Sequence, residues 1–138
     1  MTSAVVAPQT INEKRIVVLL IEDDKAISSM YQRRFDFEGG FKIVIANNGQ
    51  EGLDALKTLN PDVILLDMMM PVMSGLETLK LIRQLPNGKS FKIVALTNMN
   101  DSDTSQTIID LGVTDHIVKA NTTPGVIVEM VRKLITAR

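Results

Sequence analysis

The sequence contains no cysteine and a single histidine, His116. Disulfide bonds and thiolate chemistry are therefore excluded, and a zinc site of the usual His/Cys type cannot be assembled, so any bound metal must be a hard ion held by oxygen. Long apolar stretches are also missing: the longest, residues 16–21, is far shorter than a bilayer-spanning helix, and residues 1–9 do not resemble a secretory signal. We therefore expect a cytoplasmic protein with no membrane partner.

Charge of one sign is not concentrated anywhere in the chain. The 15 Lys and Arg residues nearly balance the 16 Asp and Glu residues, and no basic run is longer than two. This distribution predicts no nucleic-acid partner, because binding along a phosphate backbone needs a basic stripe or patch. A chain of 138 residues has room for one hydrophobic core. We expect residues 1–14 to form a flexible N-terminal tail and residues 15–138 to form a single domain.

Apolar runs alternate with amphipathic segments along the rest of the chain. The runs are 16–21, 43–46, 63–66, 93–96 and 117–118. The segments between and after them predict helices over about 25–38, 50–59, 76–84, 103–111 and 124–136. Runs that are apolar throughout are typical of strands covered on both faces. The pattern predicts an α/β fold, a doubly wound five-stranded parallel sheet with five helices.

The last helical segment, 124–136, has the clearest amphipathic pattern. Its apolar side chains share one stripe, which comprises Val126, Ile127, Met130, Val131, Leu134 and Ile135. Glu129, Arg132 and Lys133 face the other way. We interpret the stripe as core and not as a partner-binding surface.

In an open sheet of this kind, ligands bind outside the carboxyl ends of the strands. The polar residues that follow the predicted strands are Glu22, Asp23, Asp24, Asp67, Thr97 and Lys119. Taken alone, each has an ordinary explanation as a turn cap, a strand-forming residue or a solvated cation. Together they would crowd carboxylates into one pocket, which costs free energy unless a cation compensates. We therefore predict a Mg2+ or Mn2+ site, where a carboxylate can accept a phosphoryl group as an aspartyl phosphate.

Four segments at these strand ends resemble the receiver domain of two-component response regulators. They are 20–24 (LIEDD), 65–75 (LLDMMMPVMSG), 95–97 (ALT) and 115–119 (DHIVK). The resemblance covers about residues 15–137, and the intervals between Asp23, Asp67, Thr97 and Lys119 are those of the family, without insertions. It implies a flavodoxin-like fold of the receiver type.

The resemblance also implies a role for each matching residue. Asp67 is the implied phosphoacceptor, and Thr97 and Lys119 are the other implied catalytic residues, each contacting a phosphoryl oxygen. The implied metal-binding set consists of Asp23, Asp67, the backbone carbonyl of Met69 and, as an outer-sphere partner, Glu22. The implied cofactor is Mg2+, with Mn2+ as the alternative.

Three positions depart from the family pattern. His116 stands where the family usually has Tyr or Phe as the aromatic switch partner of Thr97; its ring either swings inward in the same way or is an ordinary, partly exposed side chain. Ala120 follows Lys119 where Pro is common, and we expect a trans peptide there because a cis bond before alanine costs about 3–4 kcal/mol. Asn98 stands where a smaller residue is frequent, which would narrow the access of the phosphodonor.

The leading interpretation is a stand-alone receiver that takes a phosphoryl group from a histidine kinase or a histidine phosphotransfer protein. It would catalyse its own phosphorylation and slow autodephosphorylation without being a conventional enzyme. It would signal by contact, through the face formed by its fourth helix, fifth strand and fifth helix, to an output protein that the sequence does not name. An alternative is a pseudo-receiver that acts only as a protein interaction module. A phosphatase of the haloacid dehalogenase type is a third, but its chemistry needs a second acid where Met69 stands.

Two methionines bear on the lifetime of the phosphorylated form. Met69 and Met99 lie two residues beyond Asp67 and Thr97, at the positions that the family places beside the approach of the attacking water. Both side chains are apolar, so neither can orient that water. We therefore predict slow autodephosphorylation; in the alternative interpretation the methionines only cover apolar surface and a backbone group orients the water.

Overall fold

Each apolar run of the sequence lies in a strand of one sheet in the computed structural model, which describes residues 14–97 and 102–136. The strands are β1 (Ile16–Ile21), β2 (Phe41–Ala46), β3 (Val63–Asp67), β4 (Ile93–Thr97) and β5 (Asp115–Val118). All neighbours pair in parallel, in the order β2-β1-β3-β4-β5. The central strands β3 and β4 are buried along their whole length, which explains why they are apolar throughout. The predicted doubly wound parallel sheet is confirmed.

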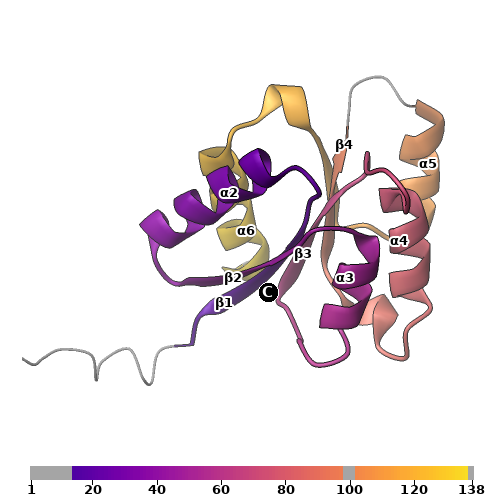
Figure 1. Cartoon of the computed structure of the whole chain (residues 1–138), viewed down its shortest axis with the longest axis horizontal. Coiled ribbons are helices and arrows are strands. Elements are labelled where there is room, and N and C mark those ends of the chain that lie inside the picture. The colour runs from indigo at the N-terminus through magenta and orange to yellow at the C-terminus, as the bar shows by residue number, and fades with distance from the viewer. Residues whose placement is uncertain (1–13, 98–101, 137–138) are drawn as a thin grey trace, which may run out of the picture.

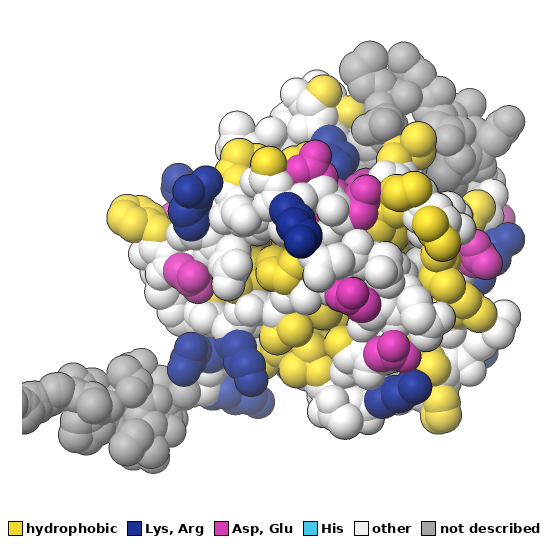
Figure 2. Space-filling model, viewed as in Figure 1, with side chains coloured by type: hydrophobic (Ala, Val, Ile, Leu, Met, Phe, Trp, Pro, Cys, Tyr) yellow, Lys and Arg dark blue, Asp and Glu magenta, His cyan; other side chains and the backbone are white. Residues whose placement is uncertain are grey.

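Five α-helices cover the two faces of the sheet in the described residues (Figure 1). They are α2 (Lys25–Glu38), α3 (Gly49–Ala55), α4 (Gly75–Arg83), α5 (Ser102–Asp110) and α6 (Pro124–Thr136). Helices α2 and α6 pack on one face, around Tyr31, Phe35 and Ile127, while α3, α4 and α5 pack on the other. On the side seen in Figure 2, charged side chains of both signs are interspersed without a basic stripe.

Several predicted boundaries are wrong, and the edges of the sheet account for two of them. Strands β2 and β5 begin two residues earlier than their apolar runs, because edge strands tolerate exposed polar residues such as Lys42 and Asp115. Helix α3 ends at Ala55 and not at 59, because the chain then tightens into turns in which the N–H groups of Lys57 and Thr58 donate to carbonyls three residues back. Two short 3-10 helices, η2 (Gly88–Ser90) and η3 (Lys119–Asn121), were not predicted.

The interpretation of the whole α6 stripe as core is also wrong. Ile127 and Val131 are buried as expected, but Val126 is 55% exposed and Val128, outside the predicted stripe, is buried. A helix that lies on a sheet buries only the side chains that point directly at it. Val126 lies at the margin of the stripe and remains outside the core.

Candidate functional site

The acidic residues meet where the strand order reverses, between β1 and β3. Glu22 and Asp23 directly follow β1, Asp67 is the last residue of β3, and the register pairs Ile21 with Leu66. This pairing places the two chain segments at the same level, and carboxylate oxygens of all three acids lie within 4.8 Å of one another. Glu22 and Asp67 are each only 1% exposed, while Asp23 is more exposed. The structure therefore brings together three of the acids that the sequence singled out.

Lys119 supplies a positive charge to this acidic cluster. It begins η3, immediately after β5, and its Nζ lies 3.3 Å from Glu22 Oε1 and 3.4 Å from Asp67 Oδ1. Burial alone lowers the pKa of Lys119, but the negative charges of Asp67 and Glu22 outweigh this effect and raise it. The ammonium group is thus held charged between two buried carboxylates.

The positive charge of Lys119 does not fully offset the effect of burial on the pKa of Glu22. Burial of its side chain, followed by hydrogen bonding and charge repulsion from Asp67, raises the pKa of Glu22 to about 7. The N–H of Asp24, 3.2 Å from Glu22 Oε2, and the charge of Lys119 lower it by less. The site therefore contains crowded carboxylate oxygens, and one carboxyl group retains a proton near neutral pH. A divalent cation fits such a site and would displace that proton.

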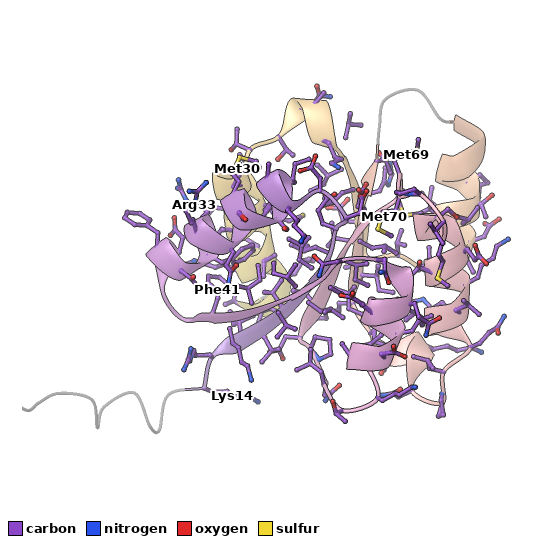
Figure 3. All side chains as sticks on the ribbon, in the orientation of Figure 1. Lys14, Met30, Arg33, Phe41, Met69 and Met70 are labelled. Carbon is purple, nitrogen blue, oxygen red and sulfur yellow. The ribbon has the colours of Figure 1, made fainter. Side chains whose placement is uncertain are left out.

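The loop after β3 fixes the orientation of Asp67. The backbone N–H of Met69 donates to Asp67 Oδ1 at 3.0 Å, and the N–H of Gly75 donates to the carbonyl of Met68 at 3.3 Å. A Cβ at Gly75 would overlap the backbone of Asp67 and Met68, so only glycine lets α4 begin this close to the site. Figure 3 shows Met69 and Met70 at this end of the molecule; the Met69 side chain is 57% exposed and that of Met70 is buried.

Thr97 and His116 do not belong to the acidic cluster. Thr97 ends β4, and its Oγ1 donates to the carbonyl of Ile117 at 3.3 Å; within the described residues no hydrogen bond links it to the carboxylates. His116 is exposed on the edge strand β5. The Lys119–Ala120 peptide is trans, as expected, since the described chain has no cis peptide bond. Asn98 and Met99 lie outside the described residues.

The structure assigns Asp24 a local role. Its Oδ1 accepts hydrogen bonds from the N–H groups of Ala26 at 2.9 Å and Ile27 at 3.2 Å, so it caps the N-terminus of α2. It is absent from the group of acids whose oxygens meet.

Sequence reasoning missed Tyr31, which lies buried on the inner side of α2. Burial raises the pKa of its phenol, which also feels the charges of Lys119, Glu22 and Asp67. An aromatic pair at Tyr31 and Phe35, one helical turn apart, is the signal that could have placed it on the inner face of this helix.

The sequence matches the response regulator receiver domain family over residues 18–132. It is 36% identical over 109 residues to the probable C4-dicarboxylate response regulator DctR of Priestia megaterium, which covers 78% of this chain and 47% of that protein. It is 34% identical over 124 residues to the protein-glutamate methylesterase/protein-glutamine glutaminase of Halalkalibacterium halodurans, covering 89% of this chain and 36% of the relative. This chain therefore spans about half or less of the length of these curated relatives.

Solved structures give the same result. The chain superposes on the chemotaxis protein CheY4 of Vibrio cholerae with a TM-score of 0.78 at 27% identity, covering 86% of this chain and 98% of that one. A receiver domain of the Francisella response regulator 1452 also matches with a TM-score of 0.78 at 27% identity, over 89% of this chain and 98% of the other. No helix of the described residues is long and apolar enough to cross a membrane. From its sequence match, its strand order and its cluster of acids with a lysine, the chain belongs to the response regulator receiver domain family.

Proposed function

We propose that Asp67 accepts a phosphoryl group from a phosphohistidine of a histidine kinase or a histidine phosphotransfer protein. The observation that carries this proposal is the position of the Lys119 ammonium, 3.4 Å from a buried Asp67 carboxylate that two further acids approach. A surface ion pair would not need three crowded carboxylates, whereas a phosphoryl-transfer site uses both signs of charge. Phosphorylation then switches the surface formed by α5, β5 and α6.

The metal-binding set in this proposal is Asp23, Asp67 and the backbone carbonyl of Met69, with Glu22 in the outer sphere. Mg2+ is the proposed ion, and Mn2+ the alternative, because carboxylate and carbonyl oxygens suit both. A bound divalent cation would supply positive charge for the incoming phosphoryl oxygens. The clustering of Glu22, Asp23 and Asp67 supports this assignment.

The transfer itself needs few groups. A carboxylate oxygen of Asp67 attacks phosphorus, the new P–O bond forms, the P–N bond to the donor imidazole breaks, and its electron pair stays on nitrogen. As negative charge moves from the Asp67 carboxylate to the phosphoryl oxygens, the Lys119 ammonium group pairs with one of these oxygens. Its second contact, to Glu22, keeps its Nζ in place. The Met69 N–H, which donates to Asp67 Oδ1, keeps the carboxylate oriented.

The switch starts at Thr97 in this proposal. Its hydroxyl now donates to the carbonyl of Ile117, the neighbour of His116 on β5. If the Thr97 hydroxyl turned toward a phosphoryl oxygen, it would break its hydrogen bond to the Ile117 carbonyl. Strand β5, with His116, could then repack. The hydroxyl therefore connects the phosphorylation site to the edge of the sheet.

A mass measurement tests the proposal. Incubation with acetyl phosphate and Mg2+ should add the mass of one phosphoryl group to the wild-type chain and none to Asp67→Asn. Asp54→Asn, which removes an exposed carboxylate on α3, is the matched control and should be labelled like wild type. Wild-type labelling of Asp67→Asn would show that another residue is the acceptor. No labelling of the wild-type chain would favour the pseudo-receiver alternative.

A further inference from the structure

The loop after β3 contains three consecutive methionines that differ in exposure. Met68 and Met70 are buried, 6% and 8% exposed, in the core on the side of α4 and α5, whereas Met69 between them is 57% exposed. Figure 3 labels Met69 and Met70 at this end of the molecule. Of the methionines in residues 14–97 and 102–136, Met69 is the most exposed, ahead of Met30 at 42%. Its thioether is therefore open to reagents dissolved in the solvent.

Met69 also borders the carboxylate of Asp67. Its backbone N–H donates to Asp67 Oδ1 at 3.0 Å, so the main chain of Met69 lies directly beside that oxygen. Asp67 itself is 1% exposed, and a water molecule can therefore approach it only past the partly exposed side chains at its border. Met69 supplies one of these, and Lys119, whose Nζ lies 3.4 Å from Asp67 Oδ1, supplies another. An unbranched side chain with three rotatable bonds can place its sulfur over that approach.

The chain has no cysteine, so methionine thioethers are its only sulfur groups. A peroxide converts a thioether to a sulfoxide. The sulfur lone pair attacks one oxygen of hydrogen peroxide, an S–O bond forms and the O–O bond breaks. The other oxygen leaves as hydroxide and takes the proton of the S–OH group, giving sulfoxide and water; sulfur loses the two electrons that the peroxide gains. A buried thioether reacts only after local opening, so Met69 should be oxidised before Met68 and Met70.

We propose that Met69 is a site of reversible oxidation, and that its sulfoxide shortens the lifetime of the phosphorylated chain. The thioether is at most a weak acceptor, whereas the sulfoxide oxygen is polar and accepts hydrogen bonds. Beside Asp67, that oxygen accepts one hydrogen of the water whose oxygen attacks the phosphoryl group. Methionine sulfoxide reductases reverse the change with two thiols, which become a disulfide as the oxygen leaves as water. The effect on lifetime rests on the proposed phosphoacceptor function; the selective oxidation of Met69 does not.

Peptide mapping of the folded full chain tests the site. Hydrogen peroxide is added until the chain has gained the mass of one oxygen atom on average, and tandem mass spectrometry locates that oxygen. Met69 should react about tenfold or more faster than Met68 and Met70, which should match it only when the chain is unfolded in urea. Equal oxidation of all three in the folded chain would overturn the proposal, as would a Met69 that stays reduced while Met30 reacts.

The decay of the aspartyl phosphate tests the consequence. Untreated and peroxide-treated chains, freed of peroxide, are phosphorylated with acetyl phosphate and Mg2+, and the loss of the phosphoryl mass is followed. Treatment should speed the loss about fivefold, which corresponds to roughly one net hydrogen bond to the attacking water. Met69→Leu should decay at one rate with and without treatment, whereas Met30→Leu, the matched change on α2, should respond like wild type. Methionine sulfoxide reductases for both sulfoxide epimers, with dithiothreitol, should restore the slower rate of wild type.

A substitution supplies the acceptor without an oxidant. Met69→Gln, whose amide oxygen accepts hydrogen bonds from the same position, should decay faster than wild type before treatment and should not respond to it. Unfolding midpoints of the treated chain and of the variants near that of untreated wild type provide the folding control.

Two results in the decay measurement would overturn the proposal. In one, treatment speeds Met69→Leu as much as wild type; in the other, the wild-type rate is unchanged although Met69 carries the oxygen. A chain that is oxidised at Met69 but takes up no phosphoryl group would contradict the phosphoacceptor function, and with it the effect on lifetime, but would confirm the oxidation site.

Discussion

The crevice at the carboxyl ends of the strands and the groove between α2 and α6 differ in how their charges are balanced. In the crevice, Lys119 already contacts Glu22 and Asp67, and all three side chains are largely buried. In the groove, Arg33 and Lys133 are exposed and form no ion pair within the described chain. The crevice groups therefore act on one another before any ligand arrives, whereas Arg33 and Lys133 in the groove lie exposed to solvent.

This difference predicts two kinds of mutational effect. Removing one member of a buried, interacting set leaves the others uncompensated, so effects in the crevice should be large and non-additive. Removing one exposed side chain from the groove should change the free energy of unfolding little. The effects of two such removals should be additive.

The largest expected effect is loss of coupling in Lys119→Met. With one cation removed, Mg2+ binding should persist or tighten, because the carboxylates lose their internal competitor. The imidazole NMR signals of His116 should move on addition of beryllofluoride and Mg2+ to wild type and should remain unmoved in the variant. Wild-type signals that do not move would remove His116 from the switch, and a full shift in the variant would show that Lys119 is dispensable.

Next in size is a contrast between two adjacent acids. Asp23→Ala should lose about tenfold or more of the Mg2+ affinity, because its carboxylate belongs to the cluster. Asp24→Ala should keep the affinity but lose about 1 kcal/mol of stability, because it removes the N-cap of α2. A Mg2+ titration and urea unfolding measure the two effects. Greater loss of affinity in Asp24→Ala than in Asp23→Ala would contradict the assignment of the ligand.

The third prediction concerns pH. Because burial and Asp67 raise the pKa of Glu22 from 4.5 to about 7, the folded chain binds more protons than the unfolded chain between these values. Without metal, stability should therefore fall as pH rises through this interval, by about 2 kcal/mol. Urea unfolding in EDTA at pH 5 and 8 measures the fall, and Glu22→Gln should abolish most of it. An equal fall in the variant would assign the effect to other groups.

Autodephosphorylation gives a smaller expected change, of several-fold. The double variant Met69→Asn with Met99→Glu should lose its phosphoryl group faster than wild type, since a polar side chain can orient the attacking water. The Met69 side chain is 57% exposed and its backbone N–H bonds to Asp67, so a side chain substituted here can reach the water that approaches Asp67. Decay of the phosphorylated mass after removal of acetyl phosphate measures the rate. Unchanged decay would mean that a backbone group, and not these side chains, orients the water.

The smallest expected effect lies in the groove. Phe37→Ser should change the free energy of unfolding by no more than about 0.5 kcal/mol, because its ring is 81% exposed and contacts Arg34 only loosely, 5.8 Å from the ring centroid. Phe35→Ser, two residues earlier and fully buried against Phe41, should by contrast cost about 3 kcal/mol or more. Urea unfolding of both variants gives the comparison, and a large loss in Phe37→Ser would show that the groove is part of the core.

The sequence by itself determined the strands, the helices and the acidic site, because each of these depends on local order. Buried parallel strands must be apolar throughout, and residues that follow such strands must meet at one edge of the sheet. Asp23, Asp67 and Lys119 are therefore identifiable from their positions directly after apolar runs. The same local rules misplaced the beginnings of the edge strands β2 and β5, which are set by the exposure of their polar residues. They also misplaced the end of α3, which is set by turn hydrogen bonds.

Only the tertiary structure decided which neighbours each side chain meets. Asp23 and Asp24 are adjacent in sequence, yet one enters the carboxylate cluster and the other caps α2, because the chain turns between them from strand to helix. Val126 matches the apolar period of α6 but lies outside the core, because the direction of α6 against α2 and the sheet determines which of its sides is covered. Period and composition specify the kind of surface an element has, whereas contact between distant segments specifies what that surface binds.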